Sequence, residues 1–486
     1  MVELQPEDMK DIQGFVMSGY AHLPCVSYLL LSVNDAPAAR VWIGQILNEV
    51  TTSEGKEFIS CLNVALTHHG LKRLGLNADT LDSFSRPFIE GMATPHRSRI
   101  LGDSDENSPE NWDWGFPKDS DDSEAVDILL LLFGKDELTL EEVINEHRAR
   151  FDQGGLILRR ALGAGRQPDI HEHFGFADGM GQPAIEGTIQ TRDAAPRNVI
   201  RTGEILLGYI NDYGKPADSP SVSPALDPLH ALLDVPAMDG AGKGQPANSG
   251  VDRPAKRDFG RNGSYLVFRQ MAQHVAKFCH FLDEATRTPD GQLDPKAGDR
   301  LAAKFVGRWQ NGAPLVLSPD ADDPALSQAD DFGFRETDEH GFKCPIGSHI
   351  RRSNPRDSVG PDAGTALATA NRHRILRRGR SYGVRPENRR IDDGVPRGLH
   401  FLCLNADIER QFEFVQQTWI NNPVFSGLDG EVDPLVGNLS KGDEIFTVQA
   451  DPLRRRVHNL ERFVTVKGGA YFFLPSIRAL RYLASL

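Results

Sequence analysis

Residues 173–183 read HFGFADGMGQP, a stretch whose GxxDG motif places Asp178 beside glycines. Glycine has no side chain, so the backbone at such a position can turn sharply and approach a flat ligand closely. The carboxylate of Asp178 is then the reactive group of the turn. The motif alone has little specificity, and its meaning depends on two segments farther along the chain.

A single histidine marks the second segment, residues 344–356, which read CPIGSHIRRSNPR. His349 lies between small residues and a basic run. Neutral imidazole is a good axial ligand for haem iron, and neighbouring guanidinium groups suit carboxylates such as haem propionates. Read alone, the segment favours a loop histidine beside a solvated basic face.

An arginine on an apolar stretch distinguishes the third segment, residues 374–383, which read RILRRGRSYG. Arg377 follows Ile375 and Leu376, so its guanidinium is presented from a partly apolar setting. Read alone, the segment favours a charged strand end or a phosphate-binding patch. The specificity of the three segments comes from their combination and order.

In combination, the three segments resemble the dye-decolorizing peroxidase family, in which GxxDG, CP…HIRxxNPR and IxRxGxxYG occur in this order. The resemblance covers nearly the whole chain and implies an α+β fold with a haem site. Other segments that carry it are DIQG (11–14), GYIN (208–211), DFGRNG (258–263), RGLHF (397–401) and FEFVQQTW (412–419).

The resemblance assigns the principal site residues by matching positions. His349 matches the proximal haem ligand. Asp178 matches the distal carboxylate, and Arg377 matches the distal arginine because it directly follows the two aliphatic positions. Leu399 and Phe401 resemble the apolar lining of the distal side. Whether Asp178 or Arg377 contributes more to catalysis is left open, since members of such a family can rely on either.

Four further residues are expected to serve the same site. Arg351 is a candidate for binding the haem carboxylates. Asp433, in VDPLVG (432–437), resembles an acid that hydrogen-bonds the proximal histidine. Tyr382 and Trp419 occupy positions that resemble relays for electrons from bulky dyes, and packing roles suit both residues at least as well.

The reaction that the resemblance implies is the reduction of hydrogen peroxide with one haem b per chain. Asp178 would move the proton between the peroxide oxygens, a role typically worth about 10²–10⁴-fold in rate. Arg377 would stabilise the charge on the departing oxygen. Small aromatic reductants, dyes and phenolics, would supply single electrons, and we expect optimal activity on the acid side of neutrality. The alternatives are a related reaction at the same haem, a non-catalytic haem-binding or haem-handling protein, and a cargo of a protein shell.

Hydrophobic and helical patterns predict two ferredoxin-like units with antiparallel sheets and peripheral helices. The resemblance implies that the two units are of the dimeric α+β barrel type. The boundary is placed at 190/191, so that residues 1–190 form one domain and residues 191–486 a second, haem-binding one. The first unit has expected strands at 27–33, 59–66, 125–133 and 156–162, and helices at 38–52 and from a capping box at Thr139 to about 150. The second has expected strands at 265–269, 399–404, 463–466 and 470–474, and helices at 273–282 and 408–419.

Three long segments interrupt these patterns. Residues 102–122, 212–261 and 318–343 are each longer than usual connections and rich in turn-forming or acidic residues. Segments of this kind are functional loops or insertions. We expect the last two to shape the access to the site.

Composition excludes several other classes of protein. The chain has 486 residues and a formal net charge of -14, which argues against general nucleic-acid binding. No run is long and apolar enough to span a bilayer, and five scattered cysteines without a CxxC pair indicate reduced thiols and a cytoplasmic location. The sequence does not reveal the oligomeric state.

Other candidate sites have simpler explanations. His171 and His173 form an HxH pair without a third ligand, so they are expected to lead into the GxxDG turn rather than to bind a metal. His68 and His69 are expected to open a surface helix. The arginine-rich residues 372–390 stand next to a haem motif in an acidic chain, which favours ion pairing over nucleic-acid binding.

Overall fold

The computed structural model describes residues 3–55, 58–116, 125–236, 256–439, 442 and 444–486. The N-terminal unit contains an antiparallel sheet in the order β2-β3-β1-β4, and its chain order confirms the expected β-α-β-β-α-β pattern. Its main elements are β1 (Cys25–Val33), α2 (Ala36–Ile46), β2 (Ser60–Leu66), β3 (Ile128–Gly134), α7 (Glu137–Arg148) and β4 (Leu156–Gly165).

Two helix boundaries in this unit differ from the predicted ones. Helix α2 is capped by Asp35, whose carboxylate accepts a hydrogen bond from the N–H of Ala38 at 3.0 Å. The helix ends at Ile46 rather than at residue 52. The predicted capping box at Thr139 is wrong. Asp136 caps α7 by accepting the N–H of Thr139 at 2.8 Å, so Thr139 lies inside the first turn.

The C-terminal unit is built on three long antiparallel strands, with β13 and β16 on either side of β10. The predicted strands 463–466 and 470–474 are one strand, since the ladder continues across a register shift between Val466 and Gly468. The predicted helix 408–419 is present as two π-helical segments. The elements are β10 (Ser264–Gln273), α8 (Val275–Ala285), β13 (Gly398–Asn405), η10 (Glu409–Glu413), η11 (Val415–Ile420) and β16 (Val464–Leu474).

The two sheets join into one nine-stranded sheet that closes on itself. Its order is β10-β16-β2-β3-β1-β4-β12-β13-β11, and β10 also pairs with β13. Two single register pairs make the joins, Phe473 with Leu66 and Ser381 with Gly165. The joining strands are β11 (Leu376–Arg377) and β12 (Arg380–Tyr382). The α+β fold is thus confirmed, whereas the boundary at residue 190/191 stays a prediction.

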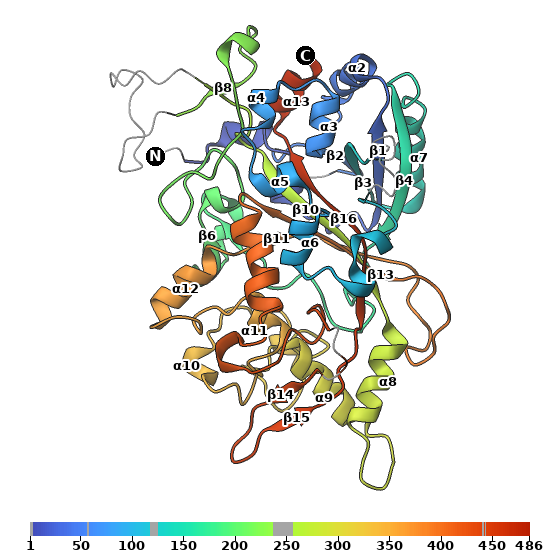
Figure 1. The fold of residues 1–486 in the computed structure, drawn as a ribbon, viewed down its shortest axis with the longest axis vertical. Coiled ribbons are helices and arrows are strands. Elements are labelled where there is room, and N and C mark those ends of the chain that lie inside the picture. The colour runs from blue at the N-terminus through green and yellow to red at the C-terminus, as the bar shows by residue number, and fades with distance from the viewer. Residues whose placement is uncertain (1–2, 56–57, 117–124, 237–255, 440–441, 443) are drawn as a thin grey trace.

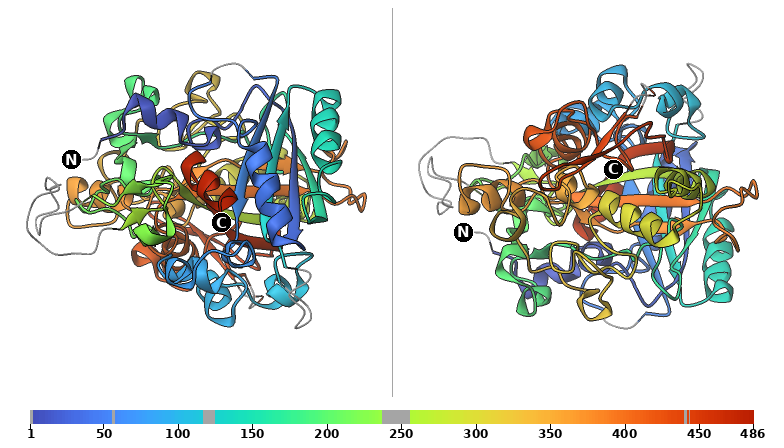
Figure 2. Two further views of the ribbon diagram at one scale, coloured as in Figure 1. Left: turned by 90° about the horizontal axis from the view of Figure 1, so that it is seen from above. Right: turned by 90° about the horizontal axis from the view of Figure 1, so that it is seen from below.

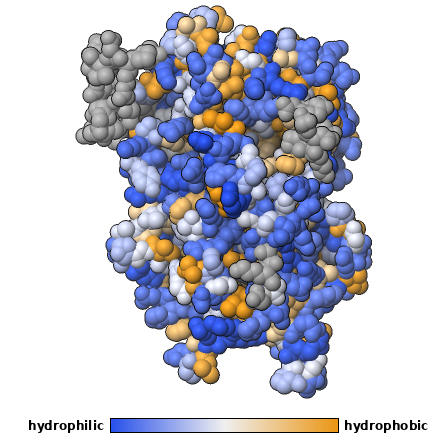
Figure 3. All heavy atoms as spheres, viewed as in Figure 1, coloured by the Kyte–Doolittle hydropathy of each residue, from blue (hydrophilic) through white to orange (hydrophobic). Residues whose placement is uncertain are grey.

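The strands bury large side chains on both faces of this closed sheet. Tyr28, Phe133 and Phe268 pack edge-to-face on the inner side. On the outer side, α2 lies beside the C-terminal helix α13 (Ile477–Ala484), where Gly44 approaches Ala484 (Figure 2). The face shown in Figure 3 is mostly hydrophilic with scattered apolar side chains.

The half of the molecule below the sheet in Figure 1 consists mainly of helices and loops of the C-terminal unit. There β10, β13 and β16 extend out of the barrel toward α8, α9 (Pro295–Val306) and α11 (His349–Ser353). The hairpin of β14 (Phe446–Val448) and β15 (Arg455–Val457) lies at the bottom of the same view. The site is therefore positioned at one end of the sheet.

Shorter elements occupy the connections. Parts of the segments 102–122 and 212–261 lie outside the described residues, whereas 318–343 is fully described. What is described of the three segments contains short helices and a small antiparallel sheet of β7, β8 and β9. Within the described residues, no helix has the length and apolar character needed to cross a membrane. The remaining elements are η1 (Pro6–Lys10), α1 (Gly14–Met17), α3 (His68–Arg73), α4 (Ala78–Leu81), α5 (Arg86–Glu90), α6 (Pro95–Leu101), η2 (Asp105–Asn107), η3 (Pro109–Asn111), β5 (Ala184–Ile185), η5 (Ile189–Arg192), η6 (Pro196–Asn198), β6 (Val199–Ile200), η7 (Thr202–Glu204), β7 (Ser221–Val222), η8 (Pro224–Leu226), β8 (Leu233–Asp234), β9 (Arg257–Asp258), η9 (Pro324–Leu326), α10 (Arg335–Asp338), α12 (Ala363–Asn371) and η12 (Phe425–Gly427).

Candidate active site

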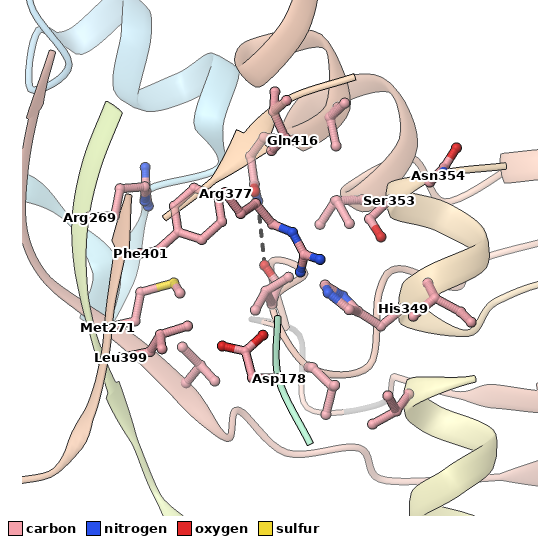
Figure 4. Close-up of a pocket in the computed structure, with 18 of the residues that line it drawn as sticks. Asp178, Arg269, Met271, His349, Ser353, Asn354, Arg377, Leu399, Phe401 and Gln416 are labelled. Atoms are coloured by element: carbon pink, nitrogen blue, oxygen red, sulfur yellow. Dashed lines mark hydrogen bonds between the residues drawn. The ribbon is translucent and has the colours of Figure 1, made fainter. Parts of the chain in front are cut away.

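A cavity of about 320 Å³ lies between the strands β10 and β13 and the helical segments α11 and η11. Figure 4 shows Asp178, Arg377 and His349 projecting into it from three separate parts of the chain. The three residues that the motifs single out are therefore brought together, although 199 positions separate the first from the last (377 − 178).

His349 is the first residue of α11 and is paired with a buried acid. Its Nδ1 lies 2.9 Å from Oδ2 of Asp433. The other oxygen, Oδ1, accepts the N–H groups of Leu435 and Val436, both at 2.9 Å. Burial raises the pKa of Asp433, but the contact with His349 and these N–H groups outweigh it, so the pKa lies below its ordinary value. With Nδ1 engaged, Nε2 is the ring nitrogen left for a ligand in the cavity.

Asp178 reaches the cavity from the glycine-rich turn. Its backbone N–H donates to the carbonyl of Ile170 at 3.0 Å, and its Oδ1 accepts the N–H of Gly179 at 2.6 Å. Gly175 and Gly179 have φ values of +96° and +93°, a region that glycine enters without steric cost. The turn therefore engages one carboxylate oxygen and leaves Oδ2 exposed to the cavity.

Glu172 supports this turn from within. Its carboxylate accepts the N–H groups of Phe174 at 2.8 Å and Phe176 at 2.9 Å, and the side-chain amide of Gln273 on β10 at 2.6 Å. Burial raises the pKa of Glu172, an effect that these three donors partly offset. A buried acid thus links the turn to the neighbouring strand.

Arg377 lies in the short strand β11 and contacts the same turn. Its backbone N–H donates to Oε1 of Gln182 at 2.9 Å, and Nη2 donates to the carbonyl of Met180 at 2.5 Å. The guanidinium keeps further N–H donors for a ligand, because it carries five. The acid and the arginine are thus fixed to one piece of backbone.

One wall of the cavity is apolar because strand side chains alternate. Leu399 and Phe401 on β13 face the cavity together with Met271 on β10, whereas His400 points to the inside of the barrel and stacks on Tyr382. The other apolar lining residues are Leu101, Phe174, Phe176, Ala177, Met180, Val306, Ile350, Ile375, Phe412, Val415, Ile420, Leu435, Val436, Val464 and Val466.

One part of the lining is strongly basic. Arg308 and Arg356 share the carboxylate of Asp330, and Arg374 donates to the carbonyl of Gly181 at 3.0 Å. Burial lowers the pKa of Arg308 and of Arg374 to about 10 each, so both stay cationic near neutral pH. Asn354 lies beside them in the lining. This part of the cavity suits a ligand with carboxylates.

The structure does not bring Arg351 to the cavity. Its guanidinium is buried and donates to the carbonyls of Asp338 at 2.9 Å, Cys344 at 3.0 Å and Glu339 at 3.0 Å. It therefore holds the segment before His349 in place. The arginines that line the basic part were not singled out by sequence, although Arg356 and Arg374 stand within the quoted motifs. No sequence signal marks Arg308 or Asp330.

The two relay candidates lie outside the lining. Tyr382 is half-buried on β12, and its ring stacks on His400 with 4.5 Å between centroids. Trp419 is buried in η11, where it packs against Phe414 and His373. Both positions are compatible with packing, and the relay role stays a prediction.

The HxH pair does not converge on a common point. His171 Nδ1 lies 2.6 Å from the carbonyl of Asp169, and His173 Nε2 lies 2.8 Å from the carbonyl of Tyr382. Among the described residues, no group of histidine, cysteine and acid side chains is arranged to hold a metal ion. His69, expected at the surface, is 2.6 Å from Oδ1 of the buried Asp127.

The lining has the donor set that a haem requires. An imidazole nitrogen is free on one side, apolar side chains cover the middle, and buried arginines stand at one part of the rim. A haem combines a metal that accepts imidazole, a flat apolar ring and two carboxylates. The residues present therefore fit this group.

Comparisons with known proteins agree with this site. No family model matches the chain. It is 28% identical to a dye-decolorizing peroxidase of Mycetinis scorodonius, over 99% of this chain and 88% of that protein. It is also 28% identical to the multifunctional dye peroxidase of an Amycolatopsis species, over 99% and 95%. Among solved structures, an ancestral D-type dye decolorizing peroxidase matches with a TM-score of 0.73 and 27% identity over 98% of both chains.

Proposed function

We infer that this chain, a homologue of the dye-decolorizing peroxidases over nearly its whole length, is a haem peroxidase that reduces hydrogen peroxide and oxidises dyes and phenolics by one-electron steps. The observation that carries this function is the meeting of Asp178, Arg377 and the His349–Asp433 pair at one cavity. An acid–base group, a fixed cation and a metal-binding imidazole are the parts that peroxide cleavage needs.

The proposed cofactor is haem b, one per chain. His349 Nε2 would bind the iron, and the arginines Arg308, Arg356 and Arg374 would face the propionates. Bound haem supplies the iron at which peroxide coordinates and the site that is oxidised. Leu399 and Phe401 would keep the rest of that face apolar and exclude competing ligands.

Asp178 is the proposed acid–base group. Its Oδ1 is engaged by Gly179, so Oδ2 is the oxygen that takes a proton from the incoming peroxide. The same atom then returns the proton to the departing oxygen, which leaves as water. A positioned group of this kind typically contributes about 10²–10⁴-fold in rate.

Arg377 and Asp433 are proposed to act through charge. The guanidinium of Arg377 would stabilise the negative charge that develops on the departing oxygen. Asp433 accepts the Nδ1 proton of His349, which raises the basicity of Nε2 and orients the ring. Both effects favour heterolytic cleavage of the O–O bond.

Bulky reductants are proposed to donate electrons at Tyr382 or Trp419. Tyr382 is half-buried on β12, where its ring stacks on His400, a neighbour of the lining residues Leu399 and Phe401. Trp419 lies in η11, whose residues Val415 and Ile420 line the cavity. Radical trapping after peroxide treatment separates the two sites. Loss of the trapped radical in Tyr382→Phe, but not in Trp419→Phe, would assign the relay to Tyr382.

Steady-state oxidation of a phenol tests the proposed function. A protein of the same fold has been solved in complex with 2,6-dimethoxyphenol, which makes this compound a reasonable first reductant. Haem-loaded protein should oxidise it only when hydrogen peroxide is present. A protein that binds haem tightly and shows no peroxide-dependent oxidation of phenols or dyes would instead be a haem-binding or haem-handling protein.

A further inference from the structure

The loop between β12 and β13 holds the turn that carries Asp178, and we propose that its residues Arg385 and Arg389 are positioning residues for the Asp178 carboxylate. This inference rests on the proposed acid–base role of Asp178. Neither arginine lines the cavity, so neither would touch haem or peroxide. Arg385 and Arg389 together are called the arginine strap below.

Arg385 binds the backbone segment that positions Asp178. Its Nη1 and Nη2 lie 2.5 and 2.9 Å from the two carboxylate oxygens of Asp169, and Nη2 also donates to the carbonyl of His171 at 2.6 Å. The residue between these two contacts is Ile170, whose carbonyl accepts the backbone N–H of Asp178. Arg385 therefore fixes the chain on both sides of the group that positions Asp178.

The conformation of Ile170 needs such a restraint. Ile170 has φ of +58°, a left-handed conformation that a β-branched residue rarely adopts. Strain of this type persists only where the surroundings determine the conformation, and it is typical of functional sites. The contacts of Arg385 with Asp169 and His171 supply the restraint on either side.

Arg389 holds the other arm of the turn. Its Nη1 donates to the carbonyl of Phe174 at 2.7 Å and lies directly over Gly175. A Cβ atom at Gly175 would stand 1.9 Å from this nitrogen, so the glycine is required for the guanidinium to fit. The GxxDG motif thus accommodates the strap as well as a ligand.

The adjacent residue offers a matched control. Arg390 belongs to the same loop, but its guanidinium forms a two-point ion pair with Asp283 of α8, at 2.7 and 2.8 Å. Its guanidinium is therefore bound to a helix and not to the Asp178 turn. Removing Arg390 removes a similar ion pair from the loop without loosening Asp178.

The strap should matter for rate, because proton transfer depends steeply on position. A displacement of about 1 Å at a catalytic group can cost about 10²-fold. We expect the double variant Arg385→Ala/Arg389→Ala to react with hydrogen peroxide at least tenfold more slowly than the parent. Arg390→Ala should react at the parental rate, and Arg385→Lys/Arg389→Lys should recover part of the loss.

A mutant cycle with Asp178→Asn is the decisive experiment. Stopped-flow rates with hydrogen peroxide are measured on haem-loaded parent, strap variant, Asp178→Asn and the combination. If the strap acts through Asp178, its loss should have no further effect in the Asp178→Asn background. An equal fold-loss in both backgrounds, or no loss in the parent, would overturn the proposal. A parental rate for Asp178→Asn would overturn the acid–base role itself, and the strap with it.

Hydrogen exchange gives a readout that does not depend on activity. The amide of Asp178 should exchange faster in the strap variant, because its hydrogen bond to Ile170 is loosened, and should exchange normally in Arg390→Ala. Unchanged protection of residues 170–179 in the strap variant would contradict the proposal even where the rate is reduced.

Discussion

Each of the three principal site residues makes a hydrogen bond that fixes its side chain and leaves its reactive atom free. Gly179 engages Oδ1 of Asp178, the carbonyl of Met180 accepts from Nη2 of Arg377, and Asp433 engages Nδ1 of His349. Side chains fixed in this way lose little entropy when substrate arrives, which is the condition for electrostatic and acid–base catalysis. This preorganisation depends on these three contacts, and mutations can remove each of them separately.

The distal pair should separate by mutation. Asp178→Asn should slow the reaction with hydrogen peroxide by about 10²–10⁴-fold, because the amide cannot take the proton. Arg377→Leu should slow the same step through lost charge stabilisation, with haem binding little changed. Stopped-flow rates and haem titrations of both variants check this, and the larger loss identifies the dominant residue. An unchanged rate in Asp178→Asn would exclude the proton-transfer role.

The proximal pair should show its effect in haem binding and in the reduction potential. His349→Ala should lower haem occupancy, since it removes the proposed ligand. Asp433→Asn should retain haem but raise the potential of the iron, because a weaker acceptor at Nδ1 makes the imidazole less basic. Absorption spectra and spectroelectrochemical titration check both changes. A spectrum of His349→Ala identical to that of the parent would refute the ligand assignment.

The motifs are sufficient to locate the main site residues that they contain. They do not locate the residues that other parts of the chain contribute to the cavity. His349, Asp178 and Arg377 could be matched by position, because each stands in a short characteristic segment. Arg351 could not be distinguished from Arg356, because only the fold shows that Arg351 turns toward Asp338 while Arg356 lines the cavity. Arg308 and Asp330 come from segments without a recognisable pattern.

At the scale of elements, strands were predicted better than helix ends. The four strands of the first unit were located within a few residues, because continuous apolar runs mark buried strands. The start of α7 was misplaced because Thr139 and Glu142 imitate a capping box, although Asp136 is a competing cap three residues earlier. The pair Gly468–Gly469 predicts a break between two strands, but the structure has a register shift there, since glycine pairs are typical of both.

The ion pair between Arg385 of the β12–β13 loop and Asp169 should remain intact at mildly acid pH. Arg385 lowers the pKa of Asp169 to about 2, so the stability that this pair contributes is fully present above the ordinary pKa of 3.8 and is lost as the pH falls through about 2. Asp169→Asn should therefore lower the free energy of unfolding at pH 5 by at most about 1 kcal/mol, because the pair is exposed. The melting temperature should fall slightly as a result.

The melting temperatures of parent and Asp169→Asn, measured from pH 6 to pH 2, test this sign. The difference between them should be constant above about pH 4 and should shrink toward zero near pH 2. A difference that grows as the pH falls would contradict the assigned direction. Asp393→Asn, which removes another pair of the same loop, is the control for general effects of charge.

At the scale of the whole molecule, a closed sheet supports a site at its end. The four strands of the N-terminal unit meet the five of the C-terminal unit through Ser381 and Gly165 on one side and Phe473 and Leu66 on the other. The duplication was visible in the sequence as two similar orders of elements, whereas this closure was not, because single register pairs leave no periodic signal. The closure fixes β10 and β13, and with them the apolar wall of the cavity.

The interior of the barrel should be the main source of this rigidity. Phe268 is fully buried and packs edge-to-face against Tyr28 and Trp114. Phe268→Ala should lower the free energy of unfolding by about 3–5 kcal/mol, since it removes apolar contacts and leaves a cavity. Chemical denaturation measures this loss. The exposed Leu138, replaced by alanine, should change it by less than about 0.5 kcal/mol. Equal effects would contradict the assigned core.

The central claim is that this cavity binds haem and cleaves peroxide, and one measurement tests it most directly. Haem-loaded protein is mixed with one equivalent of hydrogen peroxide in a stopped-flow spectrophotometer, and 2,6-dimethoxyphenol is added afterwards. We predict a rapid change of the Soret band at a rate proportional to peroxide concentration, followed by a return to the starting spectrum in two one-electron steps. A Soret band that does not respond to peroxide would contradict the account.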